Sequence, residues 1–243
     1  MGSPLGSPDD RAGTGRAVRD MFAAVAPRYD FLNHFLSLGR DITWRRSTAR
    51  SLVDALAQPG SVALDVCCGT GDLALALARV ASGTVIGTDF CHPMLERASE
   101  KAKAPHQAPY FLAADTLTLP FADESFDVVA SAFGFRNLAN YAHGLAEMRR
   151  VLKPGGRVAI LEFSRVRWPL FGPLFRFYFR RVLPRLGTLV SGVQGPYQYL
   201  PDSVAQFPDQ EALAARMREA GFTKVCYRNF SGGIAALHLG ERS

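Results

Sequence analysis

This chain of 243 residues lacks the long apolar runs and leader segments of membrane and secreted proteins. It contains no stretch of about 18 uncharged apolar residues, which a membrane-spanning helix requires. Residues 1–15 are rich in Gly, Ser, Pro and Asp, without the basic start and apolar core of a signal peptide. We therefore expect a disordered tail over 1–15 and a cytoplasmic protein with no transmembrane helix.

Cysteine and histidine are also scarce, and neither occurs in a metal-binding pattern. None of the four cysteines forms a CxxC pair, and the adjacent Cys67 and Cys68 lie in an apolar run, where free cysteine acts as a small hydrophobe. The five histidines show no HxH or HxxxH spacing. The sequence therefore predicts a reducing compartment, free thiols and no metal site.

The apolar sequence that is present is sufficient for one α/β domain. Hydrophobic residues make up 48% of the chain and charged residues 21%, which are proportions typical of a globular protein. Helical patterns over Arg16–Ala26 and Asp41–Ala57 predict a helical cap over about 16–58. We expect a single domain over 16–243, in which this cap precedes the sheet.

Strand and helix periods alternate through the middle of the chain. Strands are expected over Val62–Cys67, Thr84–Thr88, Pro109–Ala113, Phe126–Ser131 and Gly156–Glu162, and helices over Leu73–Val80, Met94–Lys103 and Tyr141–Leu152. Such alternation predicts a doubly wound parallel sheet with helices on both faces.

The C-terminal part breaks the alternation. A helix over Asp209–Ala220 is followed by strands over Phe222–Phe230 and Ile234–Leu239, which a Gly232–Gly233 turn joins as a hairpin. The last strand is therefore expected to run antiparallel to its neighbours. The predicted fold class is α/β, a Rossmann-like, mostly parallel doubly wound sheet with an antiparallel C-terminal hairpin strand, which is typical of class I methyltransferases.

A glycine-rich turn follows the first strand, in the run Asp65-Val66-Cys67-Cys68-Gly69-Thr70-Gly71-Asp72. Its two glycines allow a tight turn and a close approach of a ligand to the backbone. Negative charge from Asp65 and Asp72 disfavours a pyrophosphate and favours the ammonium and sulfonium groups of S-adenosylmethionine. The GxGxxA pattern of nicotinamide oxidoreductases is an alternative, and Asp72 alone is also explained by the helix N-terminus.

Carboxylates also end the next two strands. Asp89 is placed where Rossmann-type sites bind ribose hydroxyls, and Asp115, with Thr116 beside it, where methyltransferases bind the adenine amino group. Ligands of open α/β sheets lie at this edge. The predicted cofactor is S-adenosylmethionine, and its candidate binding residues are Asp65, Gly69, Thr70, Gly71, Asp89, Asp115 and Thr116.

Longer segments make the chain resemble the ubiquinone/menaquinone biosynthesis C-methyltransferase family, from about Val18 to its end. They are Tyr29–Asn33, Leu119–Phe121, Phe133–Asn137, Arg150–Ser164, Tyr199–Ser203 and Gly232–His238. Two positions depart from the family pattern. Leu32 replaces a Met, and Asp41 stands where the family has His, three residues before Trp44. Asp41 either alters a step of the chemistry or caps the helix that contains Trp44.

The resemblance implies methyl transfer from S-adenosylmethionine to a ring carbon of a reduced polyprenyl quinone precursor, with demethylmenaquinol as the favoured substrate. No residue separates this substrate from the ubiquinone precursor, and another small molecule or RNA is the next alternative. A module that holds the cofactor without catalysis is the alternative of another class, which the intact set of carboxylates disfavours.

Three residues are candidates for catalysis in this reaction. Arg136 is placed to stabilise a forming phenolate or to orient a water that relays its proton, or else it pairs with Glu162 or another acid. Asn137 is placed to hydrogen-bond a quinol oxygen. Tyr29, together with Asp30, is expected either to close over the cofactor or to pack at a helix end.

Basic residues concentrate in an expected lid insertion over about 165–205. Six arginines and no acid lie between Phe163 and Pro201, interleaved with aromatic and aliphatic residues. A helix over 168–185 is expected to contact anionic membrane peripherally and admit a lipophilic quinol, or to cover the pocket. We expect no nucleic-acid partner, because the aromatic residues are spaced for burial. The oligomeric state stays open, with a homodimer as one option.

Overall fold

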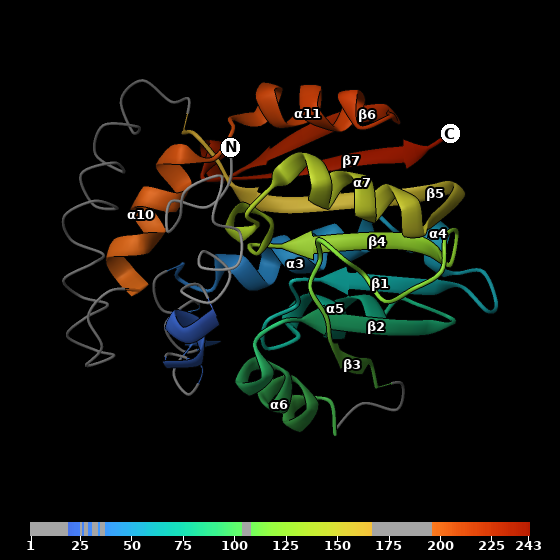
Figure 1. Cartoon of the computed structure of the whole chain (residues 1–243), viewed down its shortest axis with the longest axis horizontal. Coiled ribbons are helices and arrows are strands. Elements are labelled where there is room, and N and C mark those ends of the chain that lie inside the picture. The colour runs from blue at the N-terminus through green and yellow to red at the C-terminus, as the bar shows by residue number, and fades with distance from the viewer. Residues whose placement is uncertain are drawn as a thin grey trace.

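The computed structural model describes residues 19–24, 26, 29–30, 34, 37–103, 108–166 and 196–243. Its centre is a seven-stranded sheet in the order β3-β2-β1-β4-β5-β7-β6 (Figure 1). The strands are β1 (Val62–Val66), β2 (Thr84–Asp89), β3 (Tyr110–Ala113), β4 (Phe126–Ala132), β5 (Leu152–Phe163), β6 (Phe222–Phe230) and β7 (Ala235–Arg242). The α-helices are α3 (Arg40–Arg50), α4 (Val53–Leu56), α5 (Asp72–Ala78), α6 (His92–Lys101), α7 (Tyr141–Val151), α10 (Pro196–Gln206) and α11 (Gln210–Glu219), and the 3-10 turns are η2 (Phe135–Asn137) and η4 (Ser231–Gly233).

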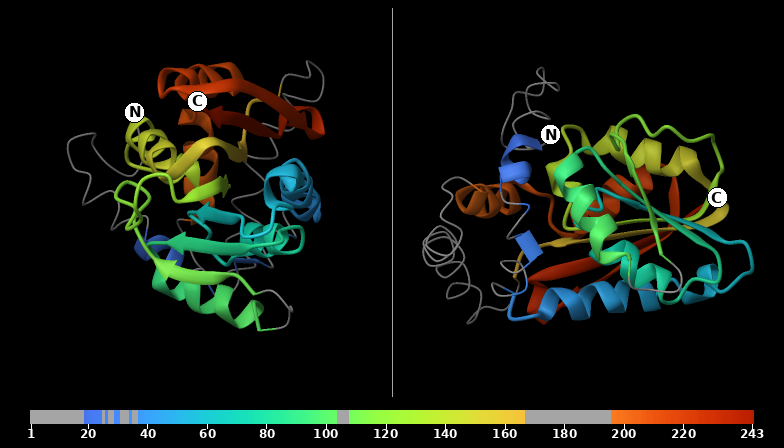
Figure 2. Two further views of the ribbon diagram at one scale, coloured as in Figure 1. Left: turned by 90° about the vertical axis from the view of Figure 1, so that its right-hand side faces the viewer. Right: turned by 90° about the horizontal axis from the view of Figure 1, so that it is seen from below.

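Apolar residues on both faces of the central strands explain why helices cover the sheet on two sides. Leu64 and Val66 of β1 belong to a core shared with α7 and α11, whereas Ala63 belongs to a second core shared with α3, α4 and α5. Figure 2 shows α3 and α7 on opposite faces of the sheet. Since side chains alternate along a strand, Asp65 points to the same face as Ala63, toward α3 and α5.

The direction of the strands agrees with the sequence prediction. Strands β1 to β5 pair in parallel, and β7 runs antiparallel between β5 and β6. Ser231, Gly232 and Gly233 reverse the chain between β6 and β7 with φ angles of 48°, 69° and 98°. Two of these three left-handed positions hold glycine, which adopts them without strain. The predicted fold class, including the antiparallel hairpin strand, is confirmed.

The largest differences from the predicted boundaries are found at two elements. The helix expected over Asp41–Ala57 divides into α3 and α4 at Leu52, whose amide bonds to the Ala49 carbonyl three residues earlier and whose backbone, with φ −111° and ψ 1°, is not helical. Strand β5 begins at Leu152, four residues before the predicted start, because Leu152 already pairs with Phe126 ahead of an irregularity in the register.

Several predictions fall partly or wholly on residues outside the described ranges. The tail over 1–15 and the helix over 168–185 lie entirely outside them. Of the expected cap, residues 19–24 are helical and α3 and α4 are seen. Of the expected insertion, α10 is seen, beyond the carboxyl end of β4 (Figure 1). Among the described residues, no helix combines the length and apolarity needed to cross a membrane.

Candidate active site

A cleft lies where the parallel strands β1, β2 and β4 end, and its empty space is about 630 Å³, counting the part open to solvent. This is the edge of an open α/β sheet where ligands bind. Of the predicted site residues, Tyr29, Gly69, Thr70, Asp89 and Asn137 line the cleft. The remaining lining residues are Phe22, Arg45, Cys67, Cys68, Asp72, Leu73, Phe90, Met94, Ala132, Phe133, Gly134 and Leu138.

The turn after β1 forms one wall of this cleft. Cys67, Gly69 and Gly71 have positive φ angles of 52°, 54° and 81°. A Cβ atom added to Gly71 would lie 2.7 Å from the ring of Phe111, so a glycine is required there. Although Gly71 shapes the turn, it does not line the cleft.

Asp89, at the end of β2, holds this turn in place. Its Oδ2 accepts a hydrogen bond from the Gly69 amide at 2.9 Å, and its Oδ1 accepts one from the Cys91 amide at 2.8 Å. Burial raises the pKa of Asp89, although these amides and that of Phe90 offset part of the effect. The carboxylate of Asp89 therefore supports the turn and also faces the cleft.

Asp65 lies beneath the turn and is fully buried, so it does not line the cleft. Neither of its carboxylate oxygens has a hydrogen-bond partner within normal geometry among the described residues, although the Ala74 amide and the Arg45 charge offset part of the effect of burial on its pKa. Burial raises the pKa of Asp65 well above its usual range. A buried carboxyl group without a partner is costly to ionise unless a cation approaches it.

Asp115 and Thr116 lie beside the cleft without lining it. The Oδ1 of Asp115 accepts from the Leu117 amide at 2.9 Å, which closes a tight turn after β3. Thr116 is buried, and its hydroxyl is 3.3 Å from the Cys67 sulfur. Their predicted contact with an adenine group remains a prediction.

The turn after β4 forms the opposite wall and contains Arg136. This side chain is 4% exposed and does not line the cleft. Its Nη1 donates to Glu162 at 3.0 and 3.2 Å and to the Phe133 carbonyl, and its backbone amide donates to Glu162 at 3.0 Å. Of the two sequence interpretations, the ion pair with Glu162 is the one that the structure contains.

Asn137 and Tyr29 face the cleft from different parts of the chain. The Asn137 Oδ1 accepts a hydrogen bond from the Tyr199 hydroxyl of α10 at 2.9 Å. The Tyr29 ring approaches to 4.0 Å from the position that a Cβ on Gly69 would occupy. Tyr29 therefore lies over the turn after β1, and its closure over a ligand remains a prediction.

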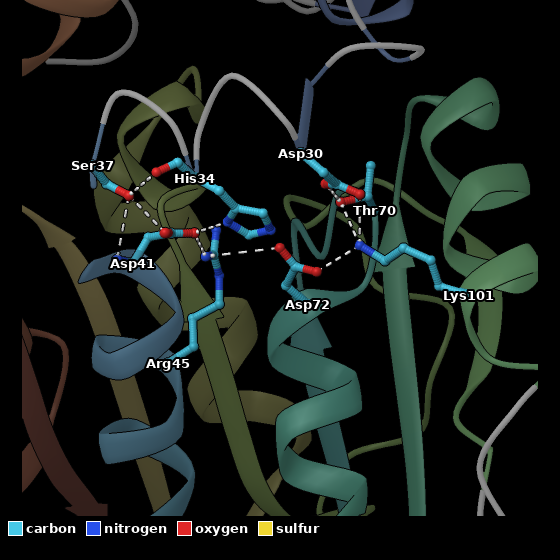
Figure 3. A network of polar contacts seen from close by, with 8 residues as sticks. All are labelled: Asp30, His34, Ser37, Asp41, Arg45, Thr70, Asp72 and Lys101. Carbon is cyan, nitrogen blue, oxygen red and sulfur yellow. Dashed lines mark hydrogen bonds and ion pairs between the residues drawn. The ribbon is translucent and has the colours of Figure 1, made fainter. Parts of the chain in front are cut away.

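A network of polar side chains ties the segment around Tyr29 to the cleft (Figure 3). Asp30 accepts from Thr70 at 2.5 Å and from Lys101 at 2.8 Å, and Lys101 also contacts Asp72 at 2.5 Å. The Arg45 guanidinium lies 3.8 Å from Asp72. Sequence reasoning missed Arg45 and Lys101.

Asp41 belongs to the same network, and the prediction that it caps α3 is wrong. Gly39 is the N-cap residue, and Asp41 is the second residue inside the helix. Its carboxylate turns instead toward Arg45, His34 at 2.8 Å and Ser37 at 2.6 Å. Burial would raise the pKa of Asp41, but Arg45, Ser37 and His34 together lower it below its usual value.

Donor atoms of His34, Asp41 and Asp72 all lie within 4.8 Å of one another, as in a metal site. The guanidinium of Arg45, however, contacts both carboxylates. An arginine therefore already supplies the cation that this group of side chains requires.

Comparison with known proteins gives three results. The family model described as the ubiE/COQ5 methyltransferase family matches residues 10–242. The chain is 49% identical over 240 residues to a demethylmenaquinone methyltransferase of Deinococcus radiodurans, covering 98% of this chain and 97% of that one. It is 45% identical over 232 residues to the ubiquinone/menaquinone biosynthesis C-methyltransferase UbiE of Geobacter sulfurreducens, covering 94% and 89%.

The fold also resembles solved structures at low sequence identity. A SAM-dependent methyltransferase of Thermotoga maritima, described as a possible histamine N-methyltransferase, superposes with a TM-score of 0.60 at 18% identity, covering 92% of this chain and all of that one. At this identity, the likeness supports the fold alone.

Proposed function

This chain belongs to the ubiE/COQ5 methyltransferase family and is an S-adenosylmethionine-dependent methyltransferase, and we propose that it methylates a ring carbon of demethylmenaquinol to give menaquinol. The observation that carries the proposal is the arrangement of the cleft. One wall is suited to a cationic nucleoside, and the opposite wall presents the amide of Asn137. The name of the Deinococcus relative favours the menaquinone precursor, and the name of the Geobacter relative keeps the ubiquinone precursor as the second candidate.

The residues of the turn after β1 fit the cofactor. S-Adenosylmethionine supplies an electrophilic methyl group on a positively charged sulfur. The uncompensated Asp65 carboxyl beneath the turn favours a cation above it, and Asp89 offers a carboxylate oxygen to ribose hydroxyls. Gly69 and Thr70 allow the ligand to reach the backbone, and Asp115 and Thr116 are proposed to meet the adenine group.

The turn after β4 fits the acceptor. Because the Asn137 Oδ1 already accepts from Tyr199, the amide N–H of Asn137 is the part left to face the cleft. We propose that it donates to the quinol oxygen next to the reacting carbon. A donor at that oxygen stabilises the phenolate, and the phenolate makes the ring carbon a stronger nucleophile.

Arg136 is proposed to act on this wall indirectly. Its guanidinium is engaged by Glu162 and by the Phe133 carbonyl, so its proposed role is to hold the turn that presents Asn137. Tyr29 is proposed to cover the cleft and to exclude water, which keeps the reacting groups in position.

The test of the proposed function is methyl transfer from labelled S-adenosylmethionine to chemically reduced demethylmenaquinone, with the ubiquinone precursor assayed in parallel. Labelled menaquinone as the main product is the expected result. A larger yield from the ubiquinone precursor would favour the second candidate. No label in either product, with cofactor binding intact, would overturn both.

The basic segment over 168–185, which lies outside the described residues, is proposed to bring the enzyme to the membrane that holds its lipophilic substrate. Vesicles with anionic lipids should then retain the protein at low salt, because arginines bind an anionic surface through screened charges. Reversal of charge at Arg176 and Arg180 should abolish retention; unchanged retention would contradict this contact.

A further inference from the structure

Arg45 is a cation on the wall of the cleft, and only part of its guanidinium is engaged. The side chain is 7% exposed and lines the cleft. Its Nη1 contacts Asp41 and lies 3.8 Å from Asp72, and its Cζ lies 5.2 Å from the centre of the Phe133 ring. Among the described residues, none hydrogen-bonds to its Nε or Nη2. These two nitrogens thus have no hydrogen-bond partner in the described part of the chain, and they belong to a side chain that lines the cleft.

Asp41 lies on the side of Arg45 away from the turn after β1, and the His34 ring lies beside the guanidinium with a nitrogen within 4.8 Å of carboxylate oxygens of both Asp41 and Asp72 (Figure 3). Asp41 is 3% exposed, and it accepts from Arg45, Ser37 and His34. Two carboxylates thus compete for one guanidinium, and the nearer one is Asp41. Without Asp41, Arg45 would be drawn fully to Asp72, whose carboxylate is part of the cleft wall.

We propose that Asp41 and His34 form a positioning pair that orients Arg45 to bind the carboxylate of the methionine part of the cofactor. This inference rests on the proposed function, since it takes S-adenosylmethionine as the ligand. Planar guanidinium and carboxylate groups bind each other through two parallel hydrogen bonds. With Nη1 held by Asp41, the edge formed by Nε and Nη2 remains for such a contact.

The pair also accounts for the departure from the family pattern at position 41. The family resemblance places a histidine there, and this chain has Asp41 instead. The imidazole is nevertheless present, because His34 contacts Asp41 with its Nδ1 at 2.8 Å. An imidazole and a carboxylate thus meet beside Arg45, and His34 supplies the imidazole.

The experiment compares two ligands that differ in the amino-acid part. S-Adenosylhomocysteine has the carboxylate that Arg45 is proposed to bind, and 5′-methylthioadenosine lacks it. Calorimetry should show Asp41→Asn weakening S-adenosylhomocysteine about 5- to 20-fold, the worth of a charge-assisted contact, and 5′-methylthioadenosine less than twofold. Arg45→Met should weaken S-adenosylhomocysteine more strongly than Asp41→Asn does, and it should likewise affect 5′-methylthioadenosine much less. Asp54→Asn, on the exposed side of α4, is the matched control and should change neither affinity.

The outcomes are separable from those of the proposed function, because no acceptor is present. Equal weakening of both ligands by Asp41→Asn would show a general structural role and overturn the proposal, as would no weakening of either. A reciprocal exchange tests the pair itself: His34→Asp combined with Asp41→His should bind S-adenosylhomocysteine more tightly than either single variant. A double variant no better than the weaker single one would overturn the role of His34.

Discussion

The turns after β1 and after β4 are alike in backbone and differ in how far their buried charge is neutralised. Each follows a buried parallel strand and begins with a non-glycine residue in the left-handed region, Cys67 at φ 52° and Phe133 at φ 60°. They also touch: a Cβ atom added to Gly134 would lie 2.4 Å from the Cys67 Cβ. Strained backbone of this kind is typical of functional sites.

The two turns differ in how far neighbouring groups of the protein neutralise their buried charge. In the turn after β4, Arg136 and Glu162 neutralise each other through several hydrogen bonds. In the turn after β1, Asp65 is buried without a hydrogen bond of normal geometry among the described residues, and the Ala74 amide and the Arg45 charge offset only part of the effect of its burial. A charge that the protein compensates supports its own structure, whereas an uncompensated one is suited to a ligand of opposite charge. The comparison supports the proposal that the acceptor lies against the turn after β4 and the cationic cofactor against the turn after β1.

The largest expected effect comes from breaking the compensated charge. Glu162→Leu leaves the guanidinium of Arg136 buried and unpaired, and such a change costs about 3–5 kcal/mol of stability. The free energy of unfolding, measured by urea titration monitored by circular dichroism, should fall by that amount. The double variant Arg136→Met, Glu162→Leu removes both charges and should recover most of the loss. A double variant as unstable as the single one would show that the pair does not act by mutual compensation.

Asp65→Asn tests the uncompensated charge and should move binding and stability in opposite directions. Loss of the carboxylate should weaken S-adenosylmethionine by about 1.5–3 kcal/mol, the usual worth of an interaction with a charged group. The variant protein without ligand should be more stable at neutral pH, because it no longer buries a carboxyl group that the unfolded chain ionises freely. Calorimetry and urea unfolding measure the two effects.

The pH dependence of the free energy of unfolding tests the direction of the stability change in Asp65→Asn. The pKa of Asp65 is raised in the folded protein, so the folded state holds its proton more tightly than the unfolded chain does. The contribution of Asp65 to the free energy of unfolding is therefore complete below about pH 4, where the carboxyl group is protonated in the folded and the unfolded protein alike. This contribution is lost as pH rises. The advantage of Asp65→Asn should grow from pH 4 to pH 8. An advantage that shrinks with rising pH would contradict the assignment.

Gly134→Ala tests the contact between the two turns. The new Cβ would meet Cys67 at 2.4 Å, and overpacking of this kind costs about 1–3 kcal/mol. Because Cys67 lines the cleft, cofactor affinity should fall together with stability. The control is Gly155→Ala, where the φ of 76° strains any side chain but no atom lies within 4 Å. That variant should lose about 1–2 kcal/mol of stability and keep its cofactor affinity.

The sequence predicted the parts of the site that depend on position along a strand. Parallel strands end at one edge, so Gly69 and Asp89 were expected together, and both line the cleft. The Gly232–Gly233 turn between two strand patterns also predicted the antiparallel direction of β7. These features follow from local pattern and a few rules of topology.

The parts that could not be predicted depend on packing between distant segments. Arg45 reaches the cleft only because α3 packs against α5, and Lys101 only because α6 ends beside Asp30. The sequence also could not decide whether Asp41 caps the helix or forms a buried ion pair, because Gly39 and Asp41 both suit the start of a helix. One local signal was available: Asp41 and Arg45 are four residues apart, the spacing of helical ion pairs.

The smallest expected effect comes from Tyr199→Phe, which tests whether the two walls of the cleft bind different ligands. Its hydroxyl donates to the Asn137 Oδ1, and a neutral hydrogen bond of this kind is worth about 0.5–1.5 kcal/mol. Without it, the Asn137 amide is free to rotate, so kcat/KM for the quinol should fall about 2- to 10-fold. The dissociation constant of S-adenosylhomocysteine should stay unchanged, because that ligand is assigned to the other wall. Tyr227→Phe, which removes an exposed hydroxyl 2.8 Å from Glu211, is the matched control and should change neither value. Weaker S-adenosylhomocysteine binding in Tyr199→Phe would mean that the two walls do not divide cofactor from acceptor.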